Sequence, residues 1–222
     1  MAVFLALVGK LLPLYLFIVA GHLLGVFLHL KRRPVALLLL YILSPLVIFE
    51  GSWTAPLSRG TLALPLLFLV ICSVLCVFFY WVSGCIWRRG DTMRNLAAFA
   101  SANGNTGYFG IPVALALFPP ERLGIVVLSS LGFVLYECST GFFVLARGNF
   151  TLRESVRKIL ALPLMYAFVL GIVVNASHVP VPELVGVVFR NVRSIYSVLG
   201  MLLIGVSLAG ERLSAIDAKL LT

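Results

Sequence analysis

Seven long apolar runs constrain this chain more than any other feature of its sequence. A transmembrane helix needs roughly 17–25 predominantly apolar residues, and seven stretches reach or approach that length. They are Leu11–Leu30, Pro34–Phe49, Leu62–Trp87, Leu96–Phe118, Leu123–Ala146, Ile159–Asn175 and Ser194–Gly210. Hydrophobic residues make up 61% of the 222 residues and charged residues only 11%, against about 25% charged residues in soluble domains. We therefore predict an all-α transmembrane protein of about seven helices, whose solvent is mostly the lipid bilayer.

The net charge of +9 comes from short clusters of Lys and Arg between the apolar runs. A bilayer explains this pattern better than nucleic acid does, so we expect no nucleic-acid partner. Twelve cations fall in one set of alternate loops: Lys31, Arg32, Arg33, Arg88, Arg89, Arg94, Arg147, Arg153, Arg157, Lys158, Arg212 and Lys219. The opposite side holds five: Lys10, Arg59, Arg122, Arg190 and Arg193. The positive-inside rule then predicts an external N-terminus and a cytoplasmic C-terminus.

A short internal repeat links the first and sixth runs. The sequence Leu-Pro-Leu at 12–14 is followed by Gly21, and the same tripeptide at 162–164 is followed by Gly171. The offset is 150 residues in both cases. Five helices separate the two copies, so the second copy enters the membrane in the opposite direction. This pattern indicates an inverted-topology repeat, a recurrent architecture of transporters.

The fourth run carries polar and helix-breaking residues at its centre. Between Ser101 and Pro112 lie three glycines and two asparagines. Glycine and proline are poor residues for a helix interior, so the backbone should open near the middle of the bilayer. Two helical halves are expected to remain, at Asn95–Ser101 and Ile111–Phe118. Open backbone at that depth persists only where it is buried in protein or lines a wet cavity.

The opened segment has the chemistry of an anion site. Pro112 suits the first turn of the second half-helix, whose free N–H groups would point toward the break with a partial positive charge. The predicted substrate-binding residues are Asn103, Gly104, Asn105, Thr106, Gly107 and Pro112. Neutral donors of this kind can hold a carboxylate without burying a full counter-charge, which is costly in a membrane. Two alternatives remain: a loop between two separate spans, and a kink packed by a neighbouring helix.

Two ionisable residues within the apolar runs are candidates for ion coupling. Glu137 lies near the middle of the fifth run and His22 near the middle of the first. An intramembrane acid is a candidate for taking up a proton or binding a cation such as sodium, and a histidine can relay a proton. The alternative for each is a hydrogen-bonded side chain packed between helices.

The fourth run resembles a known family. The sequence Asn103–Pro112 is similar to the fourth-helix signature of the auxin efflux carrier family, which includes bacterial permeases. The segments Leu12–Leu14 with Gly21, Leu43–Pro45 and Leu203–Leu208 also resemble that family. The resemblance to bacterial permeases implies a bacterial inner membrane as the location. It implies ten helices in two inverted five-helix repeats. It also implies that the fourth helix crosses the ninth at a proline-broken centre, where a small carboxylate binds.

On this reading residues 1–146 form the first five-helix repeat, and 159–222 form two helices of an incomplete second repeat. We expect a secondary transporter of small organic anions working by alternating access, not an enzyme. It should have no cofactor or metal, and its partners are the anion, the lipid bilayer, a proton or sodium ion, and a second copy in a homodimer. The alternatives are a seven-helix receptor or sensor, or a non-transporting truncated remnant. The seventh run lacks the lysine that a retinal photosensor needs.

Overall fold

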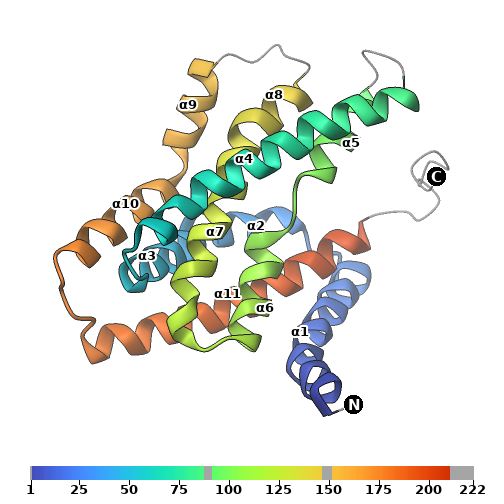
Figure 1. The fold of residues 1–222 in the computed structure, drawn as a ribbon. Helices are drawn as coiled ribbons and strands as arrows, with labels where there is room; N and C mark the ends of the chain where they lie inside the picture. Colours follow the sequence, from blue (N-terminus) through green and yellow to red (C-terminus); the bar gives the residue numbers. More distant parts are fainter. Residues whose placement is uncertain (1, 88–91, 147–151, 211–222) are drawn as a thin grey trace.

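The computed structural model describes residues 2–87, 92–146 and 152–210, and the described chain is built from helices (Figure 1). The α-helices are α1 (Ala2–Phe27), α2 (Arg32–Leu38), α3 (Ser44–Thr54), α4 (Arg59–Val82), α5 (Thr92–Ser101), α6 (Ile111–Leu117), α7 (Leu123–Tyr136), α8 (Phe142–Leu145), α9 (Leu152–Ala161), α10 (Pro163–Ala176) and α11 (Glu183–Ala209). Three π-helical turns join some of them: η1 (Leu39–Leu43), η3 (Thr106–Gly110) and η5 (Glu137–Gly141). Two short 3₁₀ turns are η2 (Ser83–Cys85) and η4 (Pro120–Arg122).

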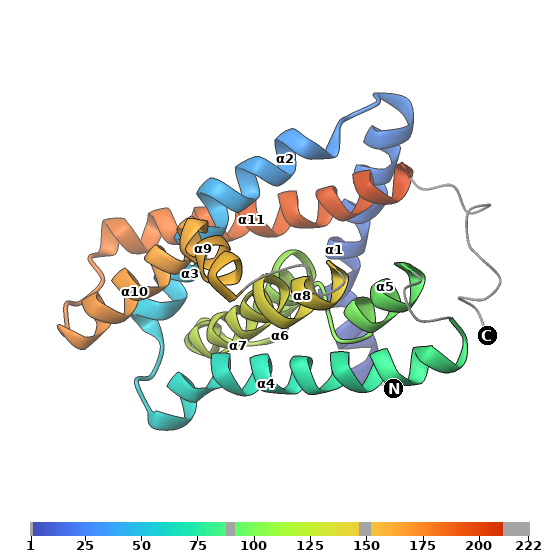
Figure 2. The same ribbon diagram turned by 90° about the horizontal axis from the view of Figure 1, so that it is seen from above.

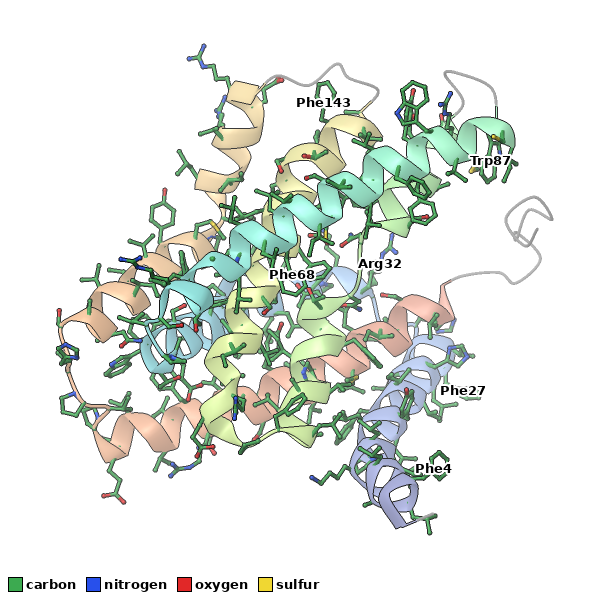
Figure 3. The ribbon with its side chains drawn as sticks, viewed as in Figure 1. Phe4, Phe27, Arg32, Phe68, Trp87 and Phe143 are labelled. Carbon is green, nitrogen blue, oxygen red and sulfur yellow. The ribbon has the colours of Figure 1, made fainter. Side chains whose placement is uncertain are left out.

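The helices form membrane crossings, as the apolar runs predict. Within the described residues, five continuous helical runs are long and apolar enough to cross a bilayer: Phe4–Phe27, Arg32–Thr54, Arg59–Cys85, Leu123–Leu145 and Glu183–Ala209. The interrupted pair α5 and α6 and the shorter apolar helix α10 correspond to the fourth and sixth runs. Large apolar side chains point outward in Figure 3, with Phe4 68% and Phe27 71% exposed. An apolar exterior of this kind suits lipid, and the all-α transmembrane fold is confirmed.

Some helices have limits that differ from those of the apolar runs, and the short seventh run extends into its flanking residues, as expected. The seventh helix begins at Glu183, not at Ser194, because the charged residues near its start do not interrupt it. Arg193 Nη1 lies 3.2 Å from Glu50 Oε1 on α3, so this charge is paired inside the protein. The sixth crossing begins later than Ile159, since α9 ends at Ala161 and a new helix begins at Pro163, where proline lacks the N–H that a continuous helix needs.

The helix α7 occupies the middle of the bundle. Both views show α7 between α4 on one side and α11 on the other (Figures 1 and 2), and α7 packs on α3 as well as on α4. Its buried residues Val127, Leu128 and Leu131 join the main apolar core, together with Val47 of α3. The core is therefore centred on the fifth crossing, next to the interrupted fourth.

Two helix pairs hold the first, second, sixth and seventh crossings together. The helix α1 packs along α11, and α3 packs along α10. Gly21 of α1 lies against the backbone of Leu202, while Gly171 of α10 lies against Phe49 and Ser52. Ser52 and Leu202 are also 150 residues apart. The two contacts thus correspond under the offset found in the sequence, which supports the division into inverted repeats; that division stays a prediction.

Candidate functional site

The fourth crossing opens where its sequence predicts. The helix α5 ends at Ser101, and residues 102–105 are not helical. The last N–H groups of the first half still bond to carbonyl groups three residues earlier in the chain. Ala102 N donates to Phe99 O at 3.3 Å, and Asn103 N donates to Ala100 O at 3.2 Å. The helical backbone resumes with the π-helical turn η3. The two alternatives, a loop between separate spans and a simple kink, do not describe this break.

Asn105 closes the second side of the break. Its side-chain Oδ1 accepts a hydrogen bond from Tyr108 N at 3.2 Å, and its carbonyl oxygen accepts from Phe109 N at 3.3 Å and Gly110 N at 3.0 Å. Such an N-cap satisfies donors that a helix start leaves free. The N–H groups of Gly104 and Gly107 take no part in these capping bonds, so backbone donors lie next to the cap.

Pro112 lies in the first turn of α6, which begins at Ile111 as predicted. The π-helical turn η3 (Thr106–Gly110) runs into α6 without a change of conformation at Gly110. Pro112 is therefore separated from the break by η3. The π-helical turn before it uses wider i→i−5 bonds, such as Gly110 N to Asn105 O, and these help the chain accommodate a residue that cannot donate.

A cavity of about 220 Å³ lies at the break. Its polar lining comes from four crossings: Ser44, Gly104, Asn105, Thr106, Gly107, Tyr108, Ser130, Glu137 and Tyr196. In the described residues, the three π-helical turns η1, η3 and η5 each contribute to this lining or directly precede a residue that does. Such turns often occur at functional sites because they displace the residues that follow from regular helical positions. Their convergence makes this cavity the candidate site.

One hydrogen bond joins the break to the fifth crossing. Asn103 Nδ2 donates to Glu137 Oε1 at 2.9 Å. The other amide atom, Asn103 Oδ1, is buried without a hydrogen-bond partner in the described part of the chain. Ser44 interacts with the phenols of Tyr108 and Tyr196, whose ring centroids are 6.2 Å apart. The cavity thus contains one carboxyl group and several hydroxyl groups.

The structure brings together most of the predicted site residues, but not all of them. Gly104, Asn105, Thr106, Gly107 and Glu137 line the cavity, and the bond to Glu137 adds Asn103. The two others lie elsewhere. Pro112 is fully buried behind the lining, and His22 is an exposed residue of α1, next to Gly205 of α11.

Sequence reasoning missed four polar cavity residues, Ser44, Tyr108, Ser130 and Tyr196. Serine and tyrosine side chains are scattered through the apolar runs, and by themselves they indicate nothing about a site. They meet only because α3, α7 and α11 pack around the break. The residue Ser44 follows η1 directly, yet a π-helical turn has no clear mark in the sequence.

The fold and the cavity define an integral membrane protein with a partly polar cavity at an interrupted crossing. A sequence model of the family described as membrane transport protein matches residues 6–155. The chain therefore belongs to this family of membrane transport proteins, the auxin efflux carrier family. No curated protein matches the chain significantly, and no solved structure does. The family consists of transporters, not enzymes, and disfavours the receptor or sensor alternative.

Proposed function

We propose that this chain is a secondary transporter, a permease or efflux carrier, that moves small organic anions such as carboxylates by alternating access. The observation that carries the proposal is the cavity in which the opened backbone of the fourth crossing faces Glu137. Open main chain inside a membrane protein marks the binding sites of several transporter architectures. The family membership supports transport as the activity.

Neutral donors would hold the carboxylate. Gly104 and Gly107 offer backbone N–H groups, Thr106 offers a hydroxyl, and Asn105 positions the turn between them. Among the residues that the structure describes, no Lys or Arg lines this cavity, so the anion would bind there without a buried counter-charge from them. Hydrogen bonds to a charged group contribute about 1.5–3 kcal/mol each, enough for three or four of them to orient a small carboxylate. In this proposal Pro112 acts from behind the lining, by shaping the helical turn.

Glu137 provides the proposed coupling to a proton or a sodium ion. An ionised Glu137 and a bound carboxylate in one small cavity would repel each other strongly, because the surroundings screen charge less than water does. Binding of the anion would therefore accompany uptake of a proton or a sodium ion at Glu137. His22 lies outside this cavity, so the proposal assigns it no step.

The direct test is transport by the purified chain in lipid vesicles, with labelled malate and labelled indole-3-acetate as probes. We expect Asn105→Ala to lower uptake at least tenfold, because it removes both the cap on Tyr108 N and an amide donor; one hydrogen bond to a charged group corresponds to about 1.5–3 kcal/mol. The matched control is Asn191→Ala, at an exposed position of α11 outside the cavity, and its uptake should equal that of the original chain.

Two results would count against the assignment. Equal uptake by the chain carrying Asn105→Ala and by the control would show that Asn105, at the break, is not part of the binding site. Saturable binding of a probe without any uptake would instead favour the non-transporting alternative. Binding is therefore measured on the same vesicles by equilibrium dialysis.

Glu137→Gln should uncouple transport from the proton or sodium gradient that drives it. Glutamine keeps the size and the hydrogen-bonding capacity of the side chain but cannot take up a proton or carry a charge. We expect stimulation of uptake by an inward proton or sodium gradient to disappear, while exchange without a gradient continues. Uptake is measured with each gradient in turn, and the gradient that stimulates the original chain identifies the ion. Glu121→Gln, in an exposed loop, is the control; unchanged stimulation after Glu137→Gln would refute the role.

The orientation and the assembly are further proposals. The excess of cations in one set of loops supports an external N-terminus and a cytoplasmic C-terminus, and the resemblance to bacterial permeases supports a bacterial inner membrane. Several of these cations, including Arg88, Arg147 and Arg212, lie outside the described residues. Arg193, counted on the external side, is paired with Glu50 inside the protein, and Arg94, counted on the cytoplasmic side, is buried as well. A homodimer is proposed on the family resemblance alone.

A further inference from the structure

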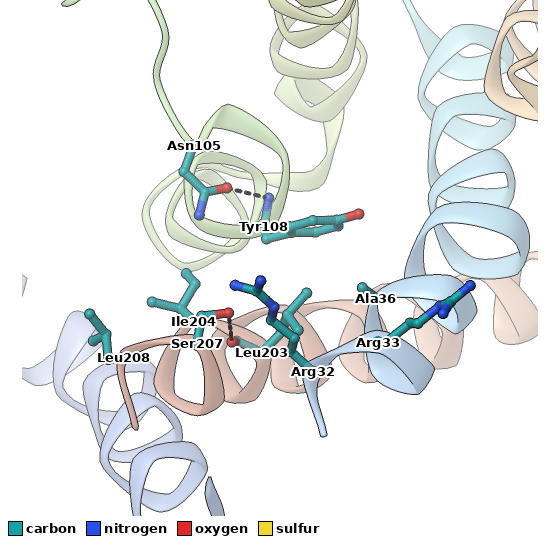
Figure 4. A pocket seen from close by; sticks show the side chains of 9 residues that line it. All are labelled: Arg32, Arg33, Ala36, Asn105, Tyr108, Leu203, Ile204, Ser207 and Leu208. Atoms are coloured by element: carbon teal, nitrogen blue, oxygen red, sulfur yellow. Dashed lines mark hydrogen bonds between the residues drawn. The ribbon is translucent and has the colours of Figure 1, made fainter. Parts of the chain in front are cut away.

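A larger groove adjoins the cavity at the break. It has a volume of about 570 Å³ and shares two of its lining residues, Asn105 and Tyr108, with the cavity. The rest of its lining comes from the start of α2 and the last part of α11, including Arg32, Arg33 and Ser207 (Figure 4). Asn105 therefore lies at the boundary between the two hollows.

The groove is positively charged, unlike the cavity. In Figure 4 the side chain of Arg32 extends toward the turn that contains Asn105 and Tyr108, whereas that of Arg33 extends away from it. No carboxylate among the described residues lines the groove or forms a salt bridge with either arginine. A neighbouring hollow of about 540 Å³ continues this surface with His29 and Lys31. The positive charge at this end of the protein is thus uncompensated by the described side chains.

We infer that the groove is a second anion-binding subsite, where Arg32 holds a small organic carboxylate before the carboxylate passes Asn105 into the cavity. This inference rests on the proposed function. A guanidinium group binds a carboxylate through two parallel hydrogen bonds, and the Asn105 amide and the Ser207 hydroxyl supply further polar groups. A full positive charge is tolerated here because the groove is open, whereas the cavity relies on neutral donors.

The two subsites have different effects on transport. A cationic groove raises the local concentration of anions and their association rate. Arg32 should therefore lower the substrate concentration needed for half-maximal uptake and have little effect on the maximal rate. The cavity, by contrast, should affect both quantities, because the anion must occupy it to cross the membrane.

The first test measures the charge of the groove without any need for transport. Ser207→Cys places a thiol in the lining, in a chain that also carries Cys85→Ser and Cys138→Ser. The thiol is reacted with an anionic and with a cationic methanethiosulfonate reagent, and the ratio of the two rates reports the local potential. Arg32→Gln should lower the anionic-to-cationic ratio about fivefold at low ionic strength, for one charge roughly 8 Å away in water. Arg157→Gln, an exposed cation outside the groove, should leave the ratio within about twofold, since distant surface charges are screened.

The second test asks what binds there. Malate should slow the reaction of the introduced thiol when Arg32 is present and should not slow it after Arg32→Gln. The measurement is made in phosphatidylcholine vesicles with and without phosphatidylglycerol. Protection by phosphatidylglycerol but not by malate would make the groove a lipid site and overturn the inference. An unchanged rate ratio after Arg32→Gln would overturn it as well.

Uptake of labelled malate separates this inference from the proposed function. We expect Arg32→Gln to raise the half-saturating concentration about fivefold or more with the maximal rate within about twofold, while Asn105→Ala lowers uptake at least tenfold. If Asn105→Ala lowers uptake to this extent and Arg32→Gln changes neither uptake nor thiol protection, the proposed function stands and the subsite is wrong. If malate protects the thiol only when Arg32 is present but the chain shows no uptake, the subsite stands and the transport proposal fails.

Discussion

Arg193→Leu is expected to destabilise the folded chain by about 3–5 kcal/mol, because it leaves the carboxylate of Glu50 without its partner in the protein interior. The two groups are 3.2 Å apart, and their side chains are 15% and 8% exposed. The second carboxylate oxygen of Glu50 is buried without a hydrogen-bond partner among the described residues, so nothing else in direct contact replaces the arginine. The measurement is chemical or thermal unfolding in detergent, followed by tryptophan fluorescence.

The double variant decides whether the pair itself is responsible. With Glu50→Leu and Arg193→Leu combined, no charge remains buried at this place, and the loss of stability should be well below the sum of the two single losses. Arg122→Leu, in an exposed loop, is the control for loss of one positive charge and should unfold like the original chain. Strictly additive losses in the double variant would show that the two side chains do not act as a pair.

The second large effect is expected at Gly171, where α10 meets α3. A Cβ atom placed on Gly171 would lie 2.6 Å from the carbonyl oxygen of Phe49 and 2.7 Å from Ser52 Cβ. The first of these is a backbone atom of a packed helix, so the helices must separate to make room. Overpacking of this kind costs about 1–3 kcal/mol, and occasionally more. We therefore expect Gly171→Ala to lower the unfolding temperature clearly and Gly171→Leu to prevent recovery of monodisperse protein, as judged by size-exclusion chromatography.

The corresponding contact should respond in the same way. Gly21 lies against the backbone of Leu202 on α11, and Gly21→Leu should match Gly171→Leu in effect. The control is Gly9→Leu, also in α1, where an added Cβ would meet nothing within 4 Å. If Gly9→Leu is as damaging as the other two, the close helix contacts are not the cause.

The main features of the fold follow from local properties of the sequence. Apolar length alone predicts the crossings, since a bilayer requires a certain helix length. The interruption after Ser101 also follows from residue type, because Asn103, Gly104 and Asn105 are poor residues for a helix interior, although Gly107 and Pro112 are accommodated in helical backbone. The start of the last helix at Glu183 could not be predicted from residue type. Arg190 and Arg193 resemble loop residues until Glu50, far away in the chain, is seen to pair with Arg193.

The candidate site was only half visible in the sequence. Residues 103–107 could be recognised because they are contiguous, and Glu137 because an acid is rare inside a membrane. Ser44, Ser130 and Tyr196 come from three other places in the chain, and their meeting depends on tertiary packing. The placement of Pro112 depended on where η3 begins, which no residue type in the segment specifies. The groove lined by Arg32 could not be recognised in the sequence for another reason. Arg32 was counted among the loop cations that set the orientation of many membrane proteins, and that role already explains its presence.

The pairing of α1 with α11 has a consequence for biosynthesis. The first helix leaves the ribosome long before the residues around Leu202 exist, by roughly 10–40 s at a synthesis rate of 5–20 residues per second. During that interval α1 has to remain inserted with lipid as its only neighbour at the Gly21 surface. Its nearly uncharged sequence, with Lys10 as the one ionised side chain between Phe4 and Phe27 when His22 is neutral, suits a helix that must be stable by itself before its partner arrives.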